Sequence, residues 1–155
     1  MIKEIFSFEE KSTICSTILR ALPDWFGNEQ SIEGYIESVR DKPFFCAFDN
    51  GKAIGFVSLE IHNAHTCEIH VMGVLESYHG RGVGRSFVER CVSFCQTRGA
   101  DFLTVKTLDE SANYAPYDRT RKFYLSMGFK PLQVFPLFWD EDNPCLLMAR
   151  YVGRY

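Results

Sequence analysis

The sequence lacks several features that would place the protein in a special class. No apolar run approaches membrane-spanning length, and the start Met1-Ile2-Lys3-Glu4 is not that of a secretory signal peptide. Neither a repeat nor a low-complexity segment occurs. Positive charge is not in excess, since the formal net charge is −3, whereas binding to phosphate backbones requires basic surfaces. We therefore expect a cytoplasmic protein whose partners include neither a membrane nor a nucleic acid.

The cysteine spacing of a metal site or of a disulfide framework is also missing. There is no Cys-x-x-Cys motif, and although Cys91 and Cys95 share one helix face, no histidine and no second cysteine pair lies near them. We expect reduced thiols packed in an apolar core, and no bound metal. The cysteines are scattered along the chain, at Cys15, Cys46, Cys67, Cys91, Cys95 and Cys145.

What the sequence does contain is an ordinary globular composition. Apolar residues make up 46% and charged residues 24% of the 155 residues, which is enough for one sizeable core. We expect a single domain over residues 1–155. Apolar periodicity and turn residues predict a mixed α/β chain in the order βααβββαβαββ.

Turn and capping residues mark the ends of the predicted elements. Asp49-Asn50-Gly51-Lys52 is a strong hairpin signal, Ser31 is a candidate helix N-cap, and Gly128 is a candidate helix stop. Strands are expected at residues 1–8, 44–48, 53–61, 66–74, 101–108, 130–139 and 145–152. Helices are expected at residues 9–22, from the cap at Ser31 through Val39, at 83–98 and at 117–127.

One stretch carries most of the functional information, a glycine-rich turn between a strand and a helix. Strand-like residues 69–75 precede it, and a helical apolar stripe begins at Val83. Glycines let the backbone approach a ligand, while the first amides of a helix lack intrahelical partners and favour an anion. We therefore expect a ligand that carries phosphates. The turn consists of His79, Gly80, Arg81, Gly82, Val83, Gly84, Arg85 and Ser86.

Two common glycine motifs do not match this turn. The dinucleotide fingerprint Gly-x-Gly-x-x-Gly would need its third glycine at Arg85 if it began at Gly80, and at Phe87 if it began at Gly82. The nucleotide P-loop needs four residues between its glycines and then a lysine, but Gly80 and Gly84 enclose three residues and an arginine follows. Both motifs fail on spacing.

The turn instead resembles the pyrophosphate loop of the GNAT superfamily of acyl-CoA-dependent N-acetyltransferases, written Gln/Arg-x-x-Gly-x-Gly/Ala. The departure is His79 at the Gln/Arg position, where a histidine still donates a hydrogen bond but has a pH-dependent charge. Residues 120–129, with Phe123 and Tyr124 before Gly128 and Phe129, resemble the family's helix that ends in Phe-Tyr-x-x-x-Gly-Phe. The two motifs together imply the GNAT fold, a central, mostly antiparallel twisted sheet flanked by helices, and acetyl-CoA as cosubstrate.

The resemblance also implies which groups serve amide transfer, a reaction that needs a base for the amine and an acid for the leaving thiolate. Tyr124 stands where the family has a tyrosine beside the thioester sulfur, and the pKa of a phenol is close to that of a thiol. Glu68 stands at the position of the catalytic glutamate of related histone acetyltransferases. His70, two residues along the same strand face, and water are the alternative bases.

Contacts to the cosubstrate follow from the same resemblance. In the family the strand splays near the position of Val74, which frees amides for the acetyl carbonyl and the pantetheine arm, and Gly73 is consistent with a bulge there. Tyr117 replaces a frequent cofactor-binding Asn, Thr120 replaces a small Ala, and Asn113 lies upstream. The expected cofactor-binding residues are Val74, Leu75, Glu76, His79, Gly80, Arg81, Gly82, Val83, Gly84, Arg85 and Tyr117.

The sequence leaves the acceptor open. Acids and aromatics gather in the two segments that usually shape the acceptor pocket of the family, and they suit a cationic amine as well as a core, a dimer surface or solvent. A small amine, a polyamine, an amino acid, an aminoglycoside and a peptide N-terminus all fit, and a homodimer stays open. A non-catalytic acyl-CoA-binding sensor and a protein lysine acetyltransferase are the alternative functions. The side chains are Asp24, Trp25, Phe26, Glu29, Phe138, Trp139, Asp140, Glu141 and Asp142.

Overall fold

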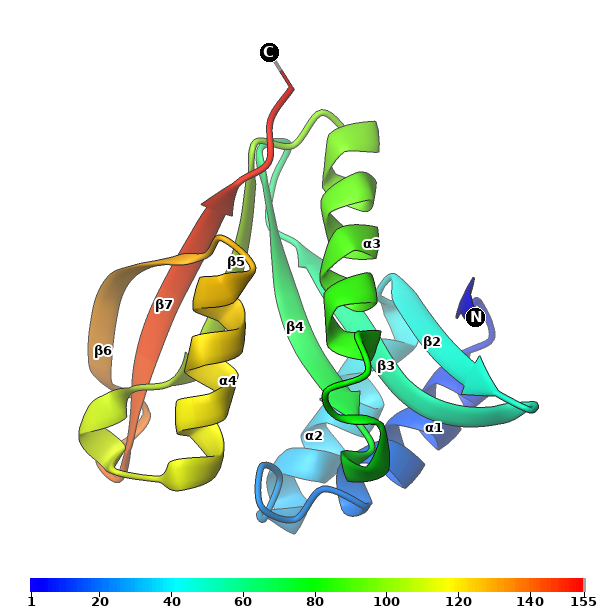
Figure 1. The fold of residues 1–155 in the computed structure, drawn as a ribbon, viewed down its shortest axis with the longest axis horizontal. Helices are drawn as coiled ribbons and strands as arrows, with labels where there is room; N and C mark the ends of the chain where they lie inside the picture. Colours follow the sequence, from blue (N-terminus) through cyan, green and yellow to red (C-terminus); the bar gives the residue numbers. More distant parts are fainter. Residues whose placement is uncertain (155) are drawn as a thin grey trace. The chain divides into compact units, whose positions relative to one another are not determined.

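A computed structural model describes residues 1–154, and it contains the predicted order of strands and helices (Figure 1). Short 3-10 turns lie at Val39–Asp41, Glu76–Tyr78 and Glu110–Ala112. The strands are β1 (Ile2–Glu4), β2 (Phe44–Asp49), β3 (Lys52–Ile61), β4 (Thr66–Val74), β5 (Phe102–Leu108), β6 (Lys130–Asp140) and β7 (Asn143–Tyr151). The helices are α1 (Phe8–Arg20), α2 (Glu29–Ser38), α3 (Val83–Thr97) and α4 (Ala115–Ser126).

The strands form one mixed sheet in the order β1-β2-β3-β4-β5-β7-β6. Pairing is antiparallel between β1 and β2, β2 and β3, β5 and β7, and β6 and β7, whereas β4 and β5 run parallel. The parallel pair joins Thr66 to Phe102 and Ile69 to Val105 at its two ends. A mostly antiparallel sheet flanked by helices is the fold class that the sequence predicted, and the prediction is confirmed.

The chain forms two compact units. Unit 1 comprises Met1–Glu60 and His70–Cys91, and unit 2 comprises Ile61–Ile69 and the chain from Val92 onward. The boundaries fall before the last residue of β3, inside β4 between Ile69 and His70, and inside α3. The first half of β4 therefore belongs to unit 2, and the end of β4 with the glycine turn belongs to unit 1.

The core of unit 1 forms where α1 packs on the sheet. Ile18 and Leu19 of α1 are fully buried, and Phe44 of β2 stacks on Phe56 of β3 with ring centroids 5.0 Å apart. A Cβ at Gly73 would lie 3.0 Å from Ile18 Cγ2. The close approach of α1 to β4 thus requires a glycine at this position.

The core of unit 2 lies between α4 and the strands β5 and β7. Helix α4 packs on β5 (Figure 1), and Leu103, Met148 and Phe129 are almost fully buried. The guanidinium of Arg150 donates to the backbone oxygen of Met127 at 2.9 Å, which satisfies a carbonyl at the end of α4. This packing holds the helix that carries Tyr124 in place.

Of the turn and capping residues predicted from the sequence, two are confirmed and one is wrong. The N-cap of α2 is Asn28, whose side-chain oxygen accepts from the amide of Ser31 at 3.0 Å, so the expected cap at Ser31 is wrong by one turn. The expected stop at Gly128 is confirmed, with φ +88°. The hairpin at Asn50-Gly51 is also confirmed, with φ of 49° and 78° at its two turn residues. None of the helices within residues 1–154 is long and apolar enough to cross a membrane.

Candidate functional site

The glycine turn of unit 1 connects β4 to the first turn of α3. Gly80 and Gly82 have φ of +75° and +83°, a conformation that L side chains rarely adopt, and a Cβ at either residue would meet no atom within 4 Å. Helix α3 begins at Val83 and continues for 15 residues. The turn is therefore an open backbone surface that ends at a helix N-terminus, as an anionic group requires.

The imidazole of His79 fixes the turn to the end of β4. Its Nε2 lies 2.6 Å from the backbone oxygen of Val74, and its ring meets the edge of the Trp25 ring at a centroid distance of 5.4 Å. The amide of His79 donates to the backbone oxygen of Glu76 at 3.0 Å. Nε2 and the backbone amide of His79 thus have partners inside the turn region, whereas the sequence had assigned His79 to the ligand.

A second side-chain contact holds the turn in place, and it joins Tyr78 and Asp49, two residues that sequence reasoning missed. The hydroxyl of Tyr78 donates to Oδ2 of Asp49 at 2.6 Å, and this hydrogen bond raises the pKa of Tyr78 above its usual value. The guanidinium of Arg81 lies 5.1 Å from the centroid of the Tyr78 ring. Asp49 precedes the β2–β3 turn, so the hairpin and the glycine turn are linked by one side-chain contact. No local pattern in the sequence signals this pairing.

Glu68, in unit 2, lies in a cluster of charged side chains. Nζ of Lys106 lies 2.9 Å from both Oε1 and Oε2 of Glu68, and Nε2 of His62 lies 2.6 Å from Oε1. The Glu68 residue is 8% exposed, and the Lys106 ammonium also lies 5.1 Å from the centroid of the Phe138 ring. A carboxylate offers about four acceptor positions, so with three occupied one remains on Oε2.

The pairing of β4 with β5 explains this cluster. Glu68 is opposite Thr104 in the parallel register, which places Lys106 two residues further along on the same face of the sheet. His62 follows the end of β3, and its amide donates to the backbone oxygen of Thr66 at 3.0 Å. Sequence reasoning missed Lys106 and His62, because nothing local says which strand lies beside Glu68.

His70, two residues after Glu68 in the sequence, has different neighbours in unit 1. Its Nε2 lies 2.7 Å from Oγ of Ser38, and its ring meets the edge of Tyr35 at a centroid distance of 5.4 Å. Both partners belong to α2. His70 is thus a second titratable group on β4, with a hydroxyl and an aromatic ring as its contacts.

Tyr124 lies on α4 of unit 2, as the motif predicted for its helix. The residue is buried, with its ring 5.3 Å from that of Phe123 and 5.4 Å from that of Phe129. Tyr117 is half-buried two residues into the helix, and Asn113 has φ +53° at the end of the preceding 3-10 turn. The Thr120 hydroxyl donates to the backbone oxygen of Pro116 at 3.4 Å.

Several of the expected acceptor-binding acids have structural partners. The Arg20 guanidinium hydrogen-bonds the Glu29 carboxylate and lowers the pKa of Glu29. Asp140 accepts from the amide of Asp142 at 2.9 Å and from the side-chain nitrogen of Asn143, which closes the β6–β7 turn. Phe138 and Trp139 are exposed, with their rings 6.0 Å apart.

The thiols of both units are buried and free, which confirms the expected reduced core cysteines. Burial raises the pKa of Cys15, Cys46 and Cys95 to about 12, and that of Cys145 to about 11. At neutral pH these groups are neutral thiols, so they do not serve as nucleophiles.

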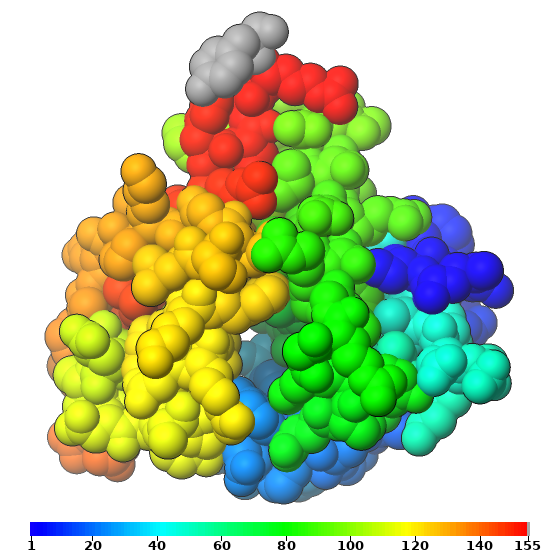
Figure 2. All heavy atoms as spheres, viewed as in Figure 1, coloured from blue at the N-terminus to red at the C-terminus, as the bar shows by residue number. Residues whose placement is uncertain are grey.

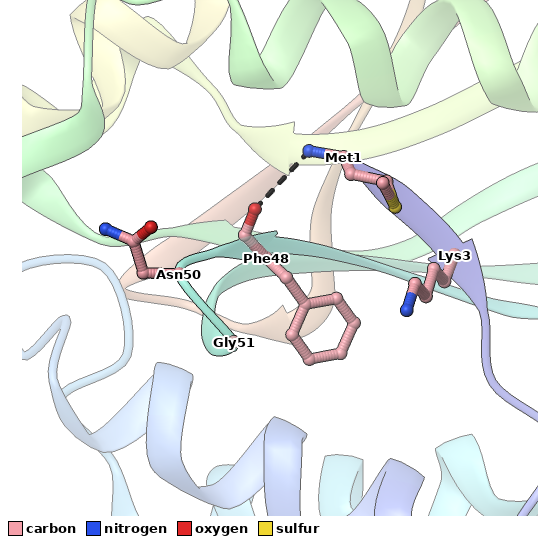
Figure 3. Close-up of a pocket in the computed structure, with 5 residues that line it drawn as sticks. All are labelled: Met1, Lys3, Phe48, Asn50 and Gly51. Carbon is pink, nitrogen blue, oxygen red and sulfur yellow. Dashed lines mark hydrogen bonds between the residues drawn. The ribbon is translucent and has the colours of Figure 1, made fainter.

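A separate pocket of about 380 Å³ opens in unit 1 beside the β2–β3 hairpin (Figure 3). It is lined by Met1, Lys3, Phe48, Asn50 and Gly51, and the Lys3 ammonium lies 5.9 Å from the centroid of the Phe48 ring. The amino group of Met1 donates to the backbone oxygen of Phe48 at 3.3 Å (Figure 3). None of the expected site residues lines this pocket.

Comparison with known proteins decides the family, since the sequence model described as the acetyltransferase (GNAT) family matches residues 10–129. The chain belongs to the GNAT acetyltransferases. This result confirms the predicted family, and with it an N-acetyltransferase activity that uses acetyl-CoA as cosubstrate. A non-catalytic sensor is not favoured.

Relatives and solved structures agree with the assignment to the GNAT family. An uncharacterized N-acetyltransferase of Chlorobaculum tepidum is 29% identical over 120 residues, which cover 76% of this chain and 69% of that protein. An aminoglycoside 6'-N-acetyltransferase complexed with coenzyme A is 19% identical, with a TM-score of 0.78 over 100% of this chain and 98% of that chain. The ribosomal-protein-S18-alanine N-acetyltransferase of Escherichia coli is 16% identical, with a TM-score of 0.76 over 100% of this chain and 96% of that chain. At these identities the two solved structures show the fold alone.

Proposed function

We propose that this GNAT enzyme transfers the acetyl group to a primary amine of a small cationic molecule or a peptide, by direct attack of the amine on the thioester. The observation that carries the proposal is the glycine turn, in which Gly80 and Gly82 hold left-handed φ values directly before α3. Left-handed glycines before a helix let several backbone amides approach one anionic group.

In this proposal the turn binds the pyrophosphate of acetyl-CoA. The first amides of α3, from Val83 onward, have no intrahelical acceptor and point toward the turn. Arg81 and Arg85 add positive charge beside them, and the backbone at Val74 and Leu75 serves the pantetheine arm. His79 acts through its contact with the Val74 oxygen, because that contact fixes the path of the turn.

Tyr124 is the proposed acid. When the amine attacks the carbonyl carbon, the carbon–sulfur bond breaks and the departing thiolate takes a proton from the phenol oxygen. The buried position of Tyr124 on α4 supports this role, because a proton donor shielded from water delivers its proton to the leaving group rather than to solvent.

Glu68 is the proposed base, acting directly or through one water molecule. Lys106 and His62 fix the carboxylate and leave one acceptor position on Oε2. His70 remains the alternative base, and its contact with Ser38 gives it a defined ring orientation.

The acceptor class rests on the chemistry of the α1–α2 segment. Trp25 and Phe26 are half-buried there, and Phe26 packs against the edge of Tyr35 with ring centroids 6.0 Å apart. Aromatic faces favour an ammonium group. By their names, the two solved structures acetylate an aminoglycoside and an alanine of ribosomal protein S18, and an acceptor of either kind presents an amine.

We further propose that residues 1–155 act as one N-acetyltransferase domain in the cytoplasm. The family match runs through both compact units without interruption. Six free, buried thiols suit a reducing compartment.

Calorimetric titration with acetyl-CoA tests the role of the turn. Gly82→Glu should abolish binding because it fills the open surface with a negative side chain. Gly99→Glu is the matched control, since Gly99 has a similar φ of +72° and equally open surroundings after α3. Equal binding by the wild type and Gly82→Glu would contradict the proposal, as would no binding to the intact protein.

Release of free thiol with a panel of amines then tests the acceptor. The panel contains a polyamine, an aminoglycoside, an amino acid and a peptide with a free N-terminal alanine. Turnover with at least one member is expected, and the specificity constants rank the acceptor classes. Binding of acetyl-CoA without turnover of any amine would favour the sensor.

A further inference from the structure

The ammonium of Lys106 occupies the position beside Glu68 that an acceptor amine needs. Its Nζ lies 2.9 Å from both carboxylate oxygens of Glu68, so a primary amine of the protein itself is within proton-transfer distance of the proposed base. The side chain of Glu68 is 11% exposed, whereas that of Lys106 is 24% exposed. A buried carboxylate therefore holds an amine that is still partly accessible.

An aromatic ring completes the surroundings of this amine. Phe138 lies on β6, whose atoms are orange at the left margin of Figure 2, and its ring centroid is 5.1 Å from the Lys106 ammonium. A carboxylate and an aromatic face are the two kinds of group that favour an ammonium ion in proteins. Lys106 thus has, within unit 2, the contacts that a cationic acceptor requires.

The strand register also leaves one side of Lys106 without a neighbouring strand. The parallel pairing of β4 with β5 ends at Ile69 and Val105, so Lys106 is the first residue of β5 beyond this register. On its other side Lys106 is opposite Leu147 of β7. The amine therefore belongs to a part of β5 whose backbone edge is released from β4.

A second lysine–glutamate pair shows what is particular to Lys106. Nζ of Lys42 lies 2.9 Å from Oε2 of Glu60, but the Glu60 side chain is 39% exposed. A carboxylate that faces water exchanges protons with solvent, whereas a carboxylate shielded from water exchanges them with the amine that it contacts. Lys42 is therefore an internal comparison for Lys106, with the same two functional groups in a different environment.

We propose that the enzyme acetylates its own Lys106, whose Nζ is a modification site served by the same groups as the external acceptor. The inference rests on the proposed function, in which Glu68 is the base and Tyr124 the acid. The ammonium gives one proton to Glu68, which passes it to solvent, and the amine nitrogen then bonds to the carbonyl carbon of the thioester. The carbon–sulfur bond breaks, the thiolate takes the phenol proton of Tyr124, and the second proton lost by the nitrogen restores the phenol.

Acetylation changes the cluster around Glu68. It removes the positive charge of Lys106 and leaves one amide N–H in place of three donors, so at most one of the two contacts with the carboxylate persists. The acetyl group also fills space beside the proposed base. We therefore expect the modified enzyme to turn over external amines more slowly, so that the enzyme limits itself when acetyl-CoA is present without an acceptor.

Mass spectrometry tests the modification site on the folded, full chain. After incubation with acetyl-CoA alone, the peptide with Lys106 should gain one acetyl group about 10²-fold faster than the peptide with Lys42, as general-base catalysis provides. A protease that does not cleave at lysine keeps both peptides comparable. The rate constant should be independent of protein concentration, because each molecule modifies itself. Equal rates at the two lysines, or a rate constant proportional to protein concentration, would overturn the proposal.

Glu68→Gln separates catalysed from purely chemical acetylation. The variant should acetylate Lys106 no faster than Lys42, while its binding of acetyl-CoA, measured by calorimetry, stays unchanged. Glu60→Gln is the matched control, since it removes the partner of Lys42 and should leave acetylation of Lys106 at the wild-type rate. An undiminished rate at Lys106 in Glu68→Gln would contradict the self-acetylation.

An external amine distinguishes this inference from the proposed function. An amine that turns over should slow the acetylation of Lys106, because both amines need Glu68. Turnover of an amine without any acetylation of Lys106 would overturn the inference and leave the proposed function standing, whereas failure to bind acetyl-CoA would overturn both.

Preincubation with acetyl-CoA tests the self-limitation. It should lower the kcat of the wild type for the external amine. It should not lower the kcat of Lys106→Arg below that variant's own starting value, because a guanidinium does not accept the acetyl group. An equal kcat of the wild type before and after preincubation would overturn the self-limitation.

Discussion

The glycine turn and the Glu68 cluster are both candidate reaction sites, but they are built in opposite ways. The turn consists of consecutive residues, and its ligand-binding groups are backbone amides set by the φ values of Gly80 and Gly82. The cluster consists of side chains that are 6 and 38 residues from Glu68 in the sequence. A backbone site depends on local conformation, whereas a side-chain cluster depends on which strands become neighbours.

The difference has a functional consequence under the proposed mechanism. Groups that hold the turn act on cosubstrate binding, so their loss should raise the KM for acetyl-CoA. Groups in unit 2 act on proton transfer, so their loss should lower kcat. A single substitution that both raises the KM for acetyl-CoA and lowers kcat would contradict this division of roles.

The largest effect is expected for Tyr124→Phe. Removal of the proposed proton donor should lower kcat about 10²- to 10⁴-fold, while acetyl-CoA affinity measured by calorimetry stays unchanged. Tyr114→Phe is the control: Tyr114 is the N-cap residue of the same helix, at the opposite end from Tyr124, and is 40% exposed. An undiminished kcat in Tyr124→Phe would remove Tyr124 from the mechanism.

Glu68→Gln should lower kcat by roughly hundredfold, because an amide cannot accept the proton of the amine. The acidic limb of the pH–rate profile should flatten at the same time. Glu60→Gln provides the control, since Glu60 also pairs with a lysine, Lys42 at 2.9 Å, but outside the cluster. If the pH profile of Glu68→Gln matches that of the wild type, the base is His70 or water.

Tyr78→Phe should affect the glycine turn rather than proton transfer, because it removes the hydrogen bond from the Tyr78 hydroxyl to Asp49. The KM for acetyl-CoA should rise about three- to tenfold, as expected for one lost hydrogen bond, with kcat unchanged. The bond raises the pKa of Tyr78 above 10.0, so it is present below pH 10 and is lost as the pH rises through the raised value. A fall in kcat with an unchanged KM would place Tyr78 in the chemistry rather than in binding.

The smallest effect concerns the thiols, which occur in both units. At neutral pH, a thiol reagent should not label these thiols in the folded protein. Labelling should follow global unfolding, so all the thiols should react at one common rate. Because burial raises the pKa of Cys46 and Cys95 from 9.0 to about 12, their contribution to stability is complete below pH 9 and is lost as the pH rises toward 12. Denaturant titrations from pH 8 upward should show this decline.

Peptide mapping of the labelled thiols sharpens the comparison between the units. Cys15, Cys46 and Cys91 belong to unit 1, and Cys67, Cys95 and Cys145 belong to unit 2. Faster labelling of either set would show that one unit opens without the other.

Much of the fold was predictable because its signals are local. The limits of β4 were predicted to the residue, and the hairpin at Asn50-Gly51 was predicted from two turn residues whose φ values are positive. Helix α4 begins two residues earlier than predicted, because Pro116 is favoured in the first turn of a helix. The N-cap of α2 is Asn28 rather than the predicted Ser31. Asn and Ser are both favourable caps, and only the backbone conformation decides between them.

The sequence by itself determined the family, the fold class and the glycine turn, because glycines at fixed spacing specify a backbone conformation without help from distant residues. It also predicted the helix of Tyr124. Tertiary structure alone decided the partners of the titratable groups: Lys106 and His62 for Glu68, Ser38 for His70, and Asp49 for Tyr78. Those contacts join residues from separate strands and helices, and a periodic pattern records only which face a residue occupies, not which element lies opposite that face.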